Sequence, residues 1–273
     1  MKKAIGIIGY GNMGSAIGEW LKLRYQIVVF DKDKNKTKNL KDLKVANNIT
    51  ELIKQAEAVI LAVKPQDFDS ILQETKDYVD NKLIISIAAG IKTSYIEKVL
   101  KKARVIRVMP NLPAKVGEGM ICLCKGQYAK QSDLDFAEQL FKNLGKTMVL
   151  KENMMDESTA ISGSGPGYLY DIAKGKTLQE IKGFAPSFAT TLTASAVSIG
   201  FSREQGKILA EMTTGGSIIY LEKEKIPPTK AKKQVASKRG TTEAGLKVLK
   251  HKVDNLTKAV QAALKRAKQL SKT

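Results

Sequence analysis

Three glycines near the start of the chain, Gly9, Gly11 and Gly14, have the spacing of a loop that holds a pyrophosphate. The apolar run 4–8 precedes them and predicts a buried parallel strand, and apolar residues at helical spacing over 13–21 predict a helix after them. A glycine turn between a strand and a helix lets a phosphate approach the backbone, and the helix N-terminus favours its negative charge. The spacing therefore predicts a phosphate-bearing ligand at this turn.

An acid at the end of a second predicted strand narrows the ligand to a dinucleotide. The apolar run 26–30 ends in Asp31, twenty positions after Gly11. In a dinucleotide-binding βαβ unit, an acid in this place accepts hydrogen bonds from the adenosine ribose, and its charge opposes the 2′-phosphate of NADP. Lys32 and two further lysines follow within five positions and could offset that charge. The sequence predicts NADH or NADPH as the cofactor, with NADH preferred.

Composition limits the other chemistry that the chain can perform. Its 273 residues are enough for two domains, and no apolar stretch reaches the length of a membrane-spanning helix, so we expect a cytoplasmic protein. Two cysteines and one histidine are too few for a disulfide framework or a typical zinc site, so no metal is predicted. That histidine, His251, lies in a lysine-rich stretch typical of a solvated surface, which argues against a serine–histidine triad.

The net charge of +19 is concentrated near the C-terminus, where residues 222–273 hold 15 Lys or Arg against 4 Asp or Glu. An excess of this size can indicate nucleic-acid binding. Few aromatic side chains, which would stack on bases, lie among these lysines. Solvated helix faces, and attraction for an anionic cofactor and substrate, explain the charge more simply. We therefore predict no nucleic-acid partner.

The chain consists of a sheet-rich half followed by a helical half. Apolar runs continue, several of them separated by amphipathic segments, at 58–63, 83–86, 105–108, 120–124 and 147–150. Strands that alternate with helices predict an α/β fold, with a Rossmann-type, doubly wound and mostly parallel sheet over 1–151. Helices are then expected at 187–199, 203–222 and 241–270. We expect 152–273 to be an all-helical domain that completes its core by pairing with a second copy of the chain.

Five further segments occur in an order that characterises a known family. They are Ala62-Val-Lys-Pro-Gln66, Ser86-Ile-Ala-Ala-Gly-Ile91, Arg107-Val-Met-Pro-Asn111 with 113–119, Ser162-Gly-Ser-Gly-Pro166, and Gly240-Thr-Thr242 with 244–246. Together they resemble pyrroline-5-carboxylate reductase over nearly the whole chain. That family reduces the cyclic imine 1-pyrroline-5-carboxylate to L-proline with NADH or NADPH, and its members pair through helical domains, some as rings of dimers. The resemblance implies an NAD(P)H-dependent oxidoreductase of proline biosynthesis.

The resemblance also implies which residues bind the cofactor. Segment 62–65 ends a predicted strand at the carboxyl edge of the sheet and would lie against the nicotinamide half of the cofactor. The small residues of 86–90 would let the nicotinamide approach closely, although tight packing explains them equally well. The implied cofactor set is Gly9, Gly11, Asn12, Met13, Gly14, Asp31, Lys32, Asn48, Ala62, Val63, Lys64, Pro65, Ala88, Ala89 and Asn111.

The implied substrate loop is 237–242, directly before a predicted helix. Backbone N–H groups at a helix N-terminus suit the small carboxylate of the substrate. Thr242 matches the threonine that in the family hydrogen-bonds the ring nitrogen, so it is the predicted catalytic residue; alternatively, Thr241 or Thr242 only caps the helix. Segment 162–166 is expected to open another helix with a serine cap, and it either shapes the substrate pocket or only forms a turn. The implied substrate-binding residues are Ser237, Arg239, Gly240, Thr241 and Thr242.

Two features depart from the family pattern. The family usually has Ser-Pro-Gly-Gly-Thr-Thr in the substrate loop, whereas this chain has Lys238 and Arg239 in place of the proline and the first glycine. Pro166 and Gly200 are 34 positions apart, which is roughly four helical turns more than is usual. The extra residues near 171–188 contain two glycines and a proline, so one continuous helix is not expected there. These departures leave open another cyclic imino acid as the substrate, or a non-catalytic NAD(P)H-sensing or interaction protein with the same fold.

Overall fold

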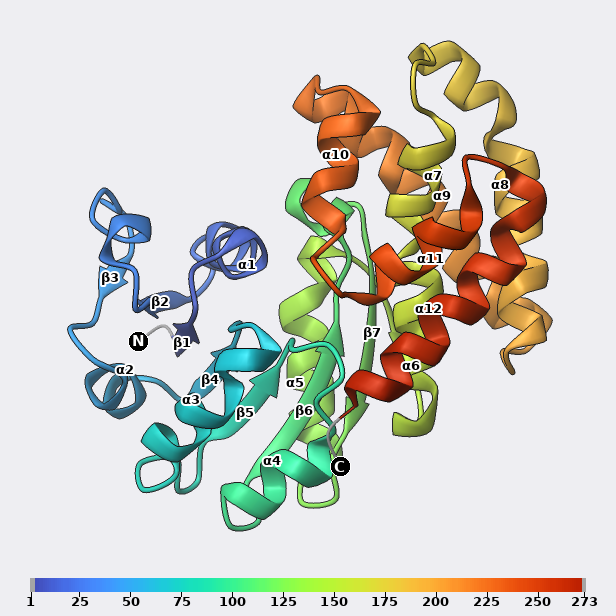
Figure 1. Cartoon of the computed structure of the whole chain (residues 1–273). Coiled ribbons are helices and arrows are strands. Elements are labelled where there is room, and N and C mark those ends of the chain that lie inside the picture. The colour runs from blue at the N-terminus through green and yellow to red at the C-terminus, as the bar shows by residue number, and fades with distance from the viewer. Residues whose placement is uncertain (1–2, 272–273) are drawn as a thin grey trace. The chain divides into compact units, whose positions relative to one another are not determined.

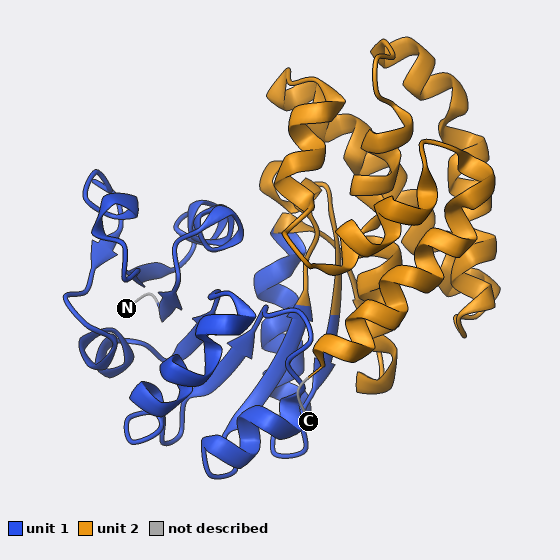
Figure 2. Ribbon diagram, viewed as in Figure 1, with its two compact units in different colours: residues 1–108, 123–143, 272–273 blue, residues 109–122, 144–271 orange. Residues whose placement is uncertain are grey.

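The computed structural model describes residues 3–271, which form two compact units (Figures 1 and 2). The first unit contains residues 3–108 and 123–143, and the second contains residues 109–122 and 144–271. This division differs from the single predicted boundary between 151 and 152. The chain leaves the first unit for the segment 109–122, returns to it, and leaves it again at residue 144, so the change from strands to helices does not mark the boundary.

One eight-stranded sheet, in the order β3-β2-β1-β4-β5-β6-β7-β8, contains the apolar runs of the sequence. Its strands are β1 (Ala4–Ile8), β2 (Gln26–Phe30), β3 (Lys44–Val45), β4 (Ala58–Leu61), β5 (Leu83–Ser86), β6 (Arg104–Met109), β7 (Gly119–Lys125) and β8 (Gly145–Val149). Strand β1 pairs in parallel with β2 and β4, and parallel pairing continues from β4 through β5 to β6. The predicted Rossmann-type, mostly parallel sheet is confirmed. The short strand β3 has two exposed residues and no apolar run that would predict it.

Helices cover both faces of the central strands in the first unit. Val59 and Ile60 are neighbours on β4 and so point to opposite faces of the sheet, and both are fully buried. Such two-sided burial is typical of a doubly wound sheet. The α-helices of this unit are α1 (Asn12–Leu21), α2 (Ile49–Gln55), α3 (Phe68–Thr75), α4 (Thr93–Val99) and α5 (Gln131–Phe141).

Helices dominate the second unit. They are α6 (Met155–Ser158), a π-helical turn (Thr159–Gly163), α7 (Gly165–Ile172), α8 (Leu178–Ser198), α9 (Arg203–Glu224), α10 (Pro228–Val235), α11 (Thr241–Leu249) and α12 (Leu256–Leu270). Within residues 3–271, no helix has the length and apolarity needed to cross a membrane. Over the same range, no group of three or more His, Cys, Asp or Glu side chains is arranged to hold a metal ion.

Helix α8 is longer than the sequence predicts, because it passes through Gly183 and Pro186 without a break. A proline inside a helix costs about 3 kcal/mol relative to alanine, so other interactions must offset this loss. At its start, Thr177 and Glu180 form a reciprocal capping box. Further along, Lys182 pairs with Glu222 of the neighbouring helix α9 at 2.5 Å. The expected interruption is real only before Leu178, where Gly175 adopts a φ of +77°.

The predicted helix 241–270 is two helices. Lys250 and His251, which follow α11, have φ values of +48° and +60°, and a left-handed backbone cannot continue a right-handed helix. A 3₁₀ turn at Val253–Asn255 then leads into α12. The apolar stripe of the sequence is real on α12, where Leu256, Val260 and Ala263 are fully buried.

Candidate active site

A pocket of about 380 Å³ in the first unit lies at the carboxyl ends of β1, β2 and β4. The strand order reverses between β1 and β4, and open α/β sheets bind ligands at such a switch point. Its lining is Ile8, Gly9, Gly11, Phe30, Asp31, Lys32, Lys36, Ala62, Val63, Lys64, Gln66, Asp67, Ser70 and Ile71. The pocket therefore includes both the glycine turn and the acid that the sequence singles out.

The three glycines of the turn meet three different requirements. Gly9 has a φ of +96°, and a Cβ there would lie 2.7 Å from the carbonyl oxygen of Ala62. A Cβ at Gly14 would collide with the carbonyl oxygen of Gly9, so a side chain there would push α1 away from the turn. A Cβ at Gly11 would meet no atom within 4 Å, and Gly11 is the N-cap of α1. This open space at the helix N-terminus fits the pyrophosphate of a dinucleotide.

The carboxylate of Asp31 is held by the glycine turn itself. Its Oδ2 accepts a hydrogen bond from the backbone N–H of Tyr10 (2.7 Å), and its Oδ1 accepts one from the backbone N–H of Asp33 (2.8 Å). Burial raises the pKa of Asp31, but these hydrogen bonds and the nearby Lys36 outweigh burial and hold the pKa below its usual value. The carboxylate is therefore ionised throughout the neutral pH range.

Two lysines bring positive charge to the same pocket. Lys36 Nζ lies 3.0 Å from Asp31 Oδ2, and Lys32 Nζ lies 2.6 Å from Asp67 Oδ1. The hydrogen bond to Asp67 raises the pKa of Lys32. The predicted cofactor set contains Lys32 but not Lys36. The position of Lys36, five residues after Asp31 in a turn, is a signal that could have indicated it. A carboxylate and two lysines therefore bring opposite charges to the same end of the pocket.

Seven of the predicted cofactor residues line this pocket: Gly9, Gly11, Asp31, Lys32, Ala62, Val63 and Lys64. Six others lie on adjoining elements: Asn12, Met13 and Gly14 in α1, Pro65 in a 3₁₀ turn after β4, and Ala88 and Ala89 in the segment after β5. The structure adds lining residues that no motif indicates, among them Asp67 and Ser70. They come from the turn and from helix α3 that follow segment 62–65, so proximity to that segment was the only available signal.

The two predicted asparagines have side-chain partners within the protein. Asn48 caps α2, because its Oδ1 accepts a hydrogen bond from the backbone N–H of Glu51 at 2.8 Å. Asn111 belongs to the second unit, where its Nδ2 donates to the carbonyl oxygen of Ser162 (3.1 Å) and its Oδ1 accepts from the N–H of Met120 (2.9 Å). These bonds give both side chains a structural task, and their contact with the cofactor stays a prediction.

The predicted substrate loop leads into α11 in the second unit. Gly240 is the N-cap of this helix and no side chain caps it, so neither threonine has the capping role that the sequence left open. Thr242 is 5 % exposed, and its hydroxyl donates a hydrogen bond to Ser164 Oγ at 3.2 Å. Thr241 Oγ1 lies at the same distance from Ser164 Oγ. Three hydroxyls therefore meet at the N-terminus of α11.

Ser164 comes from the segment 162–166, which the sequence assigns to a helix start with a serine cap. Ser164 is indeed the N-cap of α7, and Pro166 lies in its first turn, but the serine side chain makes no capping hydrogen bond. The π-helical turn before it and the close packing of α7 against α11 direct the Ser164 hydroxyl to Thr241 and Thr242 instead. Sequence reasoning did not include Ser164 among the site residues, since its partners are 77 and 78 positions away.

Glycines permit the close approach of α7 to α11. A Cβ at Gly167 would lie 2.5 Å from the methyl carbon of Thr242. A Cβ at Gly245 would lie 2.7 Å from the hydroxyl oxygen of Tyr168, which is fully buried on α7. The position of Thr242 therefore depends on small residues on both helices.

The two residues that depart from the family pattern, Lys238 and Arg239, are exposed. Arg239 has a φ of +58°, a conformation that favours glycine. Its backbone N–H donates to the carboxylate of Glu243, and its carbonyl oxygen accepts a hydrogen bond from Arg266 Nε at 2.8 Å. The backbone of Arg239 is thus fixed while its side chain remains accessible. Ser237 is exposed as well.

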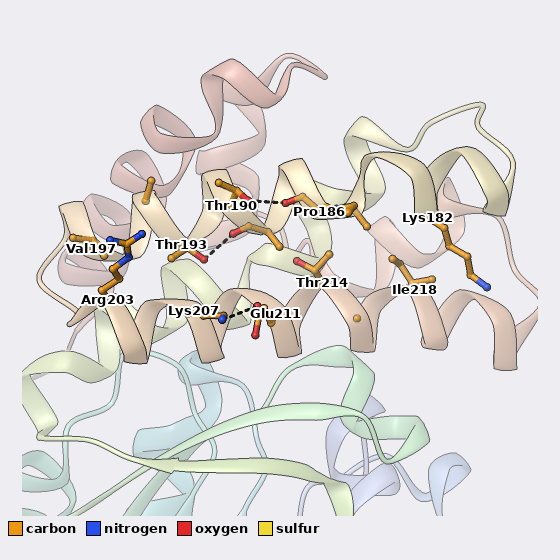
Figure 3. Close-up of a pocket in the computed structure, with 14 residues that line it drawn as sticks. Lys182, Pro186, Thr190, Thr193, Val197, Arg203, Lys207, Glu211, Thr214 and Ile218 are labelled. Carbon is orange, nitrogen blue, oxygen red and sulfur yellow. Dashed lines mark hydrogen bonds and ion pairs between the residues drawn. The ribbon is translucent and has the colours of Figure 1, made fainter.

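A groove of about 990 Å³ runs between α8 and α9 in the second unit (Figure 3). Small and apolar residues line much of it, including Ala189, Val197 and Gly215. Lys182 lies near one end, and Arg203 lies near the other (Figure 3). Lys182, Ala185 and Pro186 line the groove at the Lys182 end, and they lie in the segment for which the sequence predicts extra length relative to the family.

Two segments of the chain match family models. Residues 4–90 match a model described as "NADP oxidoreductase coenzyme F420-dependent", and residues 181–270 match one described as "Pyrroline-5-carboxylate reductase dimerisation". The first match contains the pocket of the first unit. The second contains the α8–α9 groove and the predicted substrate loop, so the second unit includes a dimerisation domain.

Whole-chain relatives agree with these matches. Pyrroline-5-carboxylate reductase of Aquifex aeolicus is 31 % identical over 91 % of this chain and 89 % of that protein, and the enzyme of Synechocystis is 30 % identical over the whole of both. A solved pyrroline-5-carboxylate reductase from Coxiella burnetii, 29 % identical, aligns over all of both chains with a TM-score of 0.67. The Plasmodium falciparum pyrroline carboxylate reductase with NADP bound, 28 % identical, aligns over 99 % of this chain and 98 % of that one with a TM-score of 0.64. The chain belongs to the pyrroline-5-carboxylate reductase family.

Proposed function

We propose that this protein reduces 1-pyrroline-5-carboxylate to L-proline with NADH or NADPH, as a step of proline biosynthesis. The observation that carries the proposal is the buried hydroxyl group of Thr242 at the N-terminus of α11, in the loop where the chain resembles the family's substrate site. Relatives named for this activity align with the whole chain, which supports the same conclusion.

The first unit would hold the cofactor in the pocket around the glycine turn. Gly11 and the N-terminus of α1 would receive the pyrophosphate, Asp31 the adenosine ribose, and the turn 62–65 the nicotinamide half. When bound, the reduced nicotinamide supplies a hydride. The remaining task of the protein is to hold the imine carbon and nitrogen in a reactive position.

The start of α11 would hold the substrate. The first N–H groups of a helix have no partner within it, and they carry positive dipole character that suits a carboxylate. Thr242 would orient the ring nitrogen and act as the catalytic residue. Arg239 lies next to the N-cap with its guanidinium accessible, so it would either reach the substrate carboxylate or remain in solvent.

For the cofactor we propose a moderate preference for NADH. The ionised Asp31 carboxylate lines the pocket and would repel a 2′-phosphate, while Lys36, 3.0 Å from it, reduces that repulsion. The ratio of kcat/KM for NADH to that for NADPH measures the outcome. A tenfold better use of NADPH would mean that the lysines dominate.

We propose that the functional protein is a homodimer, and that a ring of dimers is the larger assembly open to it. A second copy would cover the α8–α9 groove, which lies within the region that matches the dimerisation model. Light scattering at several concentrations measures the assembly. A monomer at all concentrations would contradict the proposal.

One assay separates the proposed activity from its alternatives. NADH and NADPH oxidation is followed with 1-pyrroline-5-carboxylate and, in parallel, with the six-membered analogue of that cyclic imine. Faster turnover of the five-membered ring supports the proposal, and faster turnover of the six-membered ring indicates a different imino acid. Tight cofactor binding without turnover of either imine would indicate a sensing protein.

A further inference from the structure

The hydroxyl of Ser164 accepts a hydrogen bond from the hydroxyl of Thr242. Thr242 Oγ1 donates to Ser164 Oγ at 3.2 Å, which is longer than the usual distance between two hydroxyl oxygens. Ser164 has no exposed surface and Thr242 is 5 % exposed, so bulk water does not compete for these groups. A hydroxyl carries one proton and two lone pairs. With its proton directed at Ser164, Thr242 can only accept a hydrogen bond from a third group.

This direction matters because the proposed substrate exists in two protonation states. A neutral imine nitrogen accepts hydrogen bonds through its lone pair, whereas a protonated imine donates one through its N–H. The protonated form is the one that accepts hydride: the hydride adds to carbon, the C=N π electrons move to nitrogen, and a neutral amine results. The N–H proton stays on the nitrogen throughout. An acceptor at Thr242 therefore stabilises the reactive form.

We propose that Ser164 is a positioning residue that fixes Thr242 as a hydrogen-bond acceptor, so that the site selects the protonated form of the imine. This inference rests on the proposed function. Thr241 supports the arrangement, because its Oγ1 lies 3.2 Å from Ser164 Oγ and can accept the proton of Ser164. With its own O–H group donating to Thr241, Ser164 remains an acceptor for Thr242.

Two titratable side chains lie close to this cluster. Tyr168 lies one helical turn after Ser164 on α7, and burial raises the pKa of its hydroxyl more than a hydrogen bond with Ser164 lowers it, so Tyr168 stays neutral over the range of an assay. Glu243 follows Thr242 on α11, where its carboxylate accepts the backbone N–H of Arg239 and lies 3.6 Å from Lys247 Nζ. The pH dependence at Thr242 should therefore come from the substrate nitrogen.

The test is the pH dependence of kcat and KM for 1-pyrroline-5-carboxylate in wild type and in Ser164→Ala. In the wild type, KM should rise with pH as the protonated imine is depleted, while kcat changes little. In Ser164→Ala, the Thr242 hydroxyl loses its acceptor and can instead donate a hydrogen bond to the nitrogen of the neutral imine. We expect KM to rise less steeply with pH, and kcat to fall about three- to tenfold, the scale of one hydrogen bond.

Matched variants separate this effect from a loss of packing. Ser162 is equally buried in the same segment, but its hydroxyl donates to the carbonyl oxygen of Ser158 at 2.9 Å, so Ser162→Ala should retain the wild-type pH dependence. Thr242→Val keeps the shape and should lower kcat at every pH. Should Ser164→Ala fail to fold, Ser164→Cys keeps the volume with a weaker acceptor, and NADH binding reports an intact first unit.

The outcomes distinguish the inference from the proposed function. A Ser164→Ala enzyme whose KM rises with pH as steeply as that of the wild type overturns the positioning role. The same follows if Ser162→Ala flattens the profile to the same extent. Wild-type protein without turnover of 1-pyrroline-5-carboxylate overturns the proposed function instead.

Discussion

The two units build their candidate sites from different parts of the chain. In the first unit the pocket depends on backbone: one glycine for its positive φ, one for the contact of helix and turn, and one for open space. In the second unit the site depends on the side-chain hydroxyls of Ser164, Thr241 and Thr242, which packing brings together from distant positions. The pocket of the first unit should lose its ligand when a Cβ is added to one of its glycines. The site of the second unit should lose activity when one of its hydroxyls loses its hydrogen-bond partner.

The largest expected effect, a loss of both stability and NADH binding, follows from a substitution within the glycine turn. Gly14→Ala places a Cβ against the carbonyl oxygen of Gly9, so we expect the free energy of unfolding to fall by about 3 kcal/mol. Chemical denaturation measures this change. NADH binding should be lost with it, because α1 can no longer lie against the turn.

Gly11→Ala is the matched control, because its Cβ meets no atom of the protein within 4 Å. We expect a loss of stability of about 1 kcal/mol or less, as for other N-cap changes. The affinity for NADH should still fall by about tenfold or more, since the new methyl group occupies space proposed for the pyrophosphate. Unchanged NADH affinity in Gly11→Ala would contradict the cofactor site.

The next largest effect is expected at the hydroxyl cluster of the second unit. Thr242→Ala should lower kcat by one to two orders of magnitude, the scale of a lost positioning contact. NADH affinity should remain within about twofold, because the proposed cofactor residues lie mainly in the first unit. Thr242→Ser retains the hydroxyl and should restore most of the turnover. Near-normal kcat in Thr242→Ala would remove Thr242 from the catalytic role.

The same contrast explains how far the sequence could predict the structure. The glycine turn, the strands and Asp31 lie within one local βαβ unit, where spacing alone determines geometry, and the structure assembles them in one pocket. Segment 162–166 was expected either to shape the substrate pocket or only to form a turn, but Ser164 was not named as a site residue, because its contact with Thr242 depends on how α7 packs against α11.

Local rules also failed where tertiary packing outweighs them. Pro186 predicts a break, yet α8 continues through it, because a capped start and the neighbouring helix α9 stabilise the whole length. At Lys250 and His251 the opposite holds: the helix breaks where no break is predicted. No proline or glycine marks these left-handed residues, which separate α11 from α12. The helix boundaries of the second unit could therefore not be derived from residue types alone.

Cofactor preference should change less than turnover, because two opposite charges share the end of the pocket that is proposed for the adenosine. Asp31→Ser removes the repulsion of a 2′-phosphate and should shift the kcat/KM ratio toward NADPH by about tenfold, or 1.4 kcal/mol. Lys36→Gln removes the partner 3.0 Å from Asp31 and should shift the ratio toward NADH by a few-fold. Parallel steady-state assays with both cofactors measure the two shifts. Shifts in the same direction would show that the charges do not act on the 2′-position.

The smallest effect is expected at Arg239, where backbone and side chain can be tested in one variant. Arg239→Gly relieves a φ of +58°, so the free energy of unfolding should rise by about 1 kcal/mol. The hydrogen bonds of the Arg239 backbone to Glu243 and Arg266 can both persist in glycine, which keeps the loop in place. The kinetic result then reports the guanidinium alone.

A guanidinium that binds the substrate carboxylate contributes mainly to affinity, so its loss should raise KM several-fold at low salt and leave kcat unchanged. Added salt should shrink the difference between wild type and Arg239→Gly, because ions screen an exposed charge pair. Equal KM values at all salt concentrations would place the side chain in solvent, as its exposure also allows. A marked gain of activity in Arg239→Gly would mean that this loop is closed to the family's substrate. The hydroxyl cluster would then serve a different imine, since Thr242 and Ser164 are unchanged in that variant.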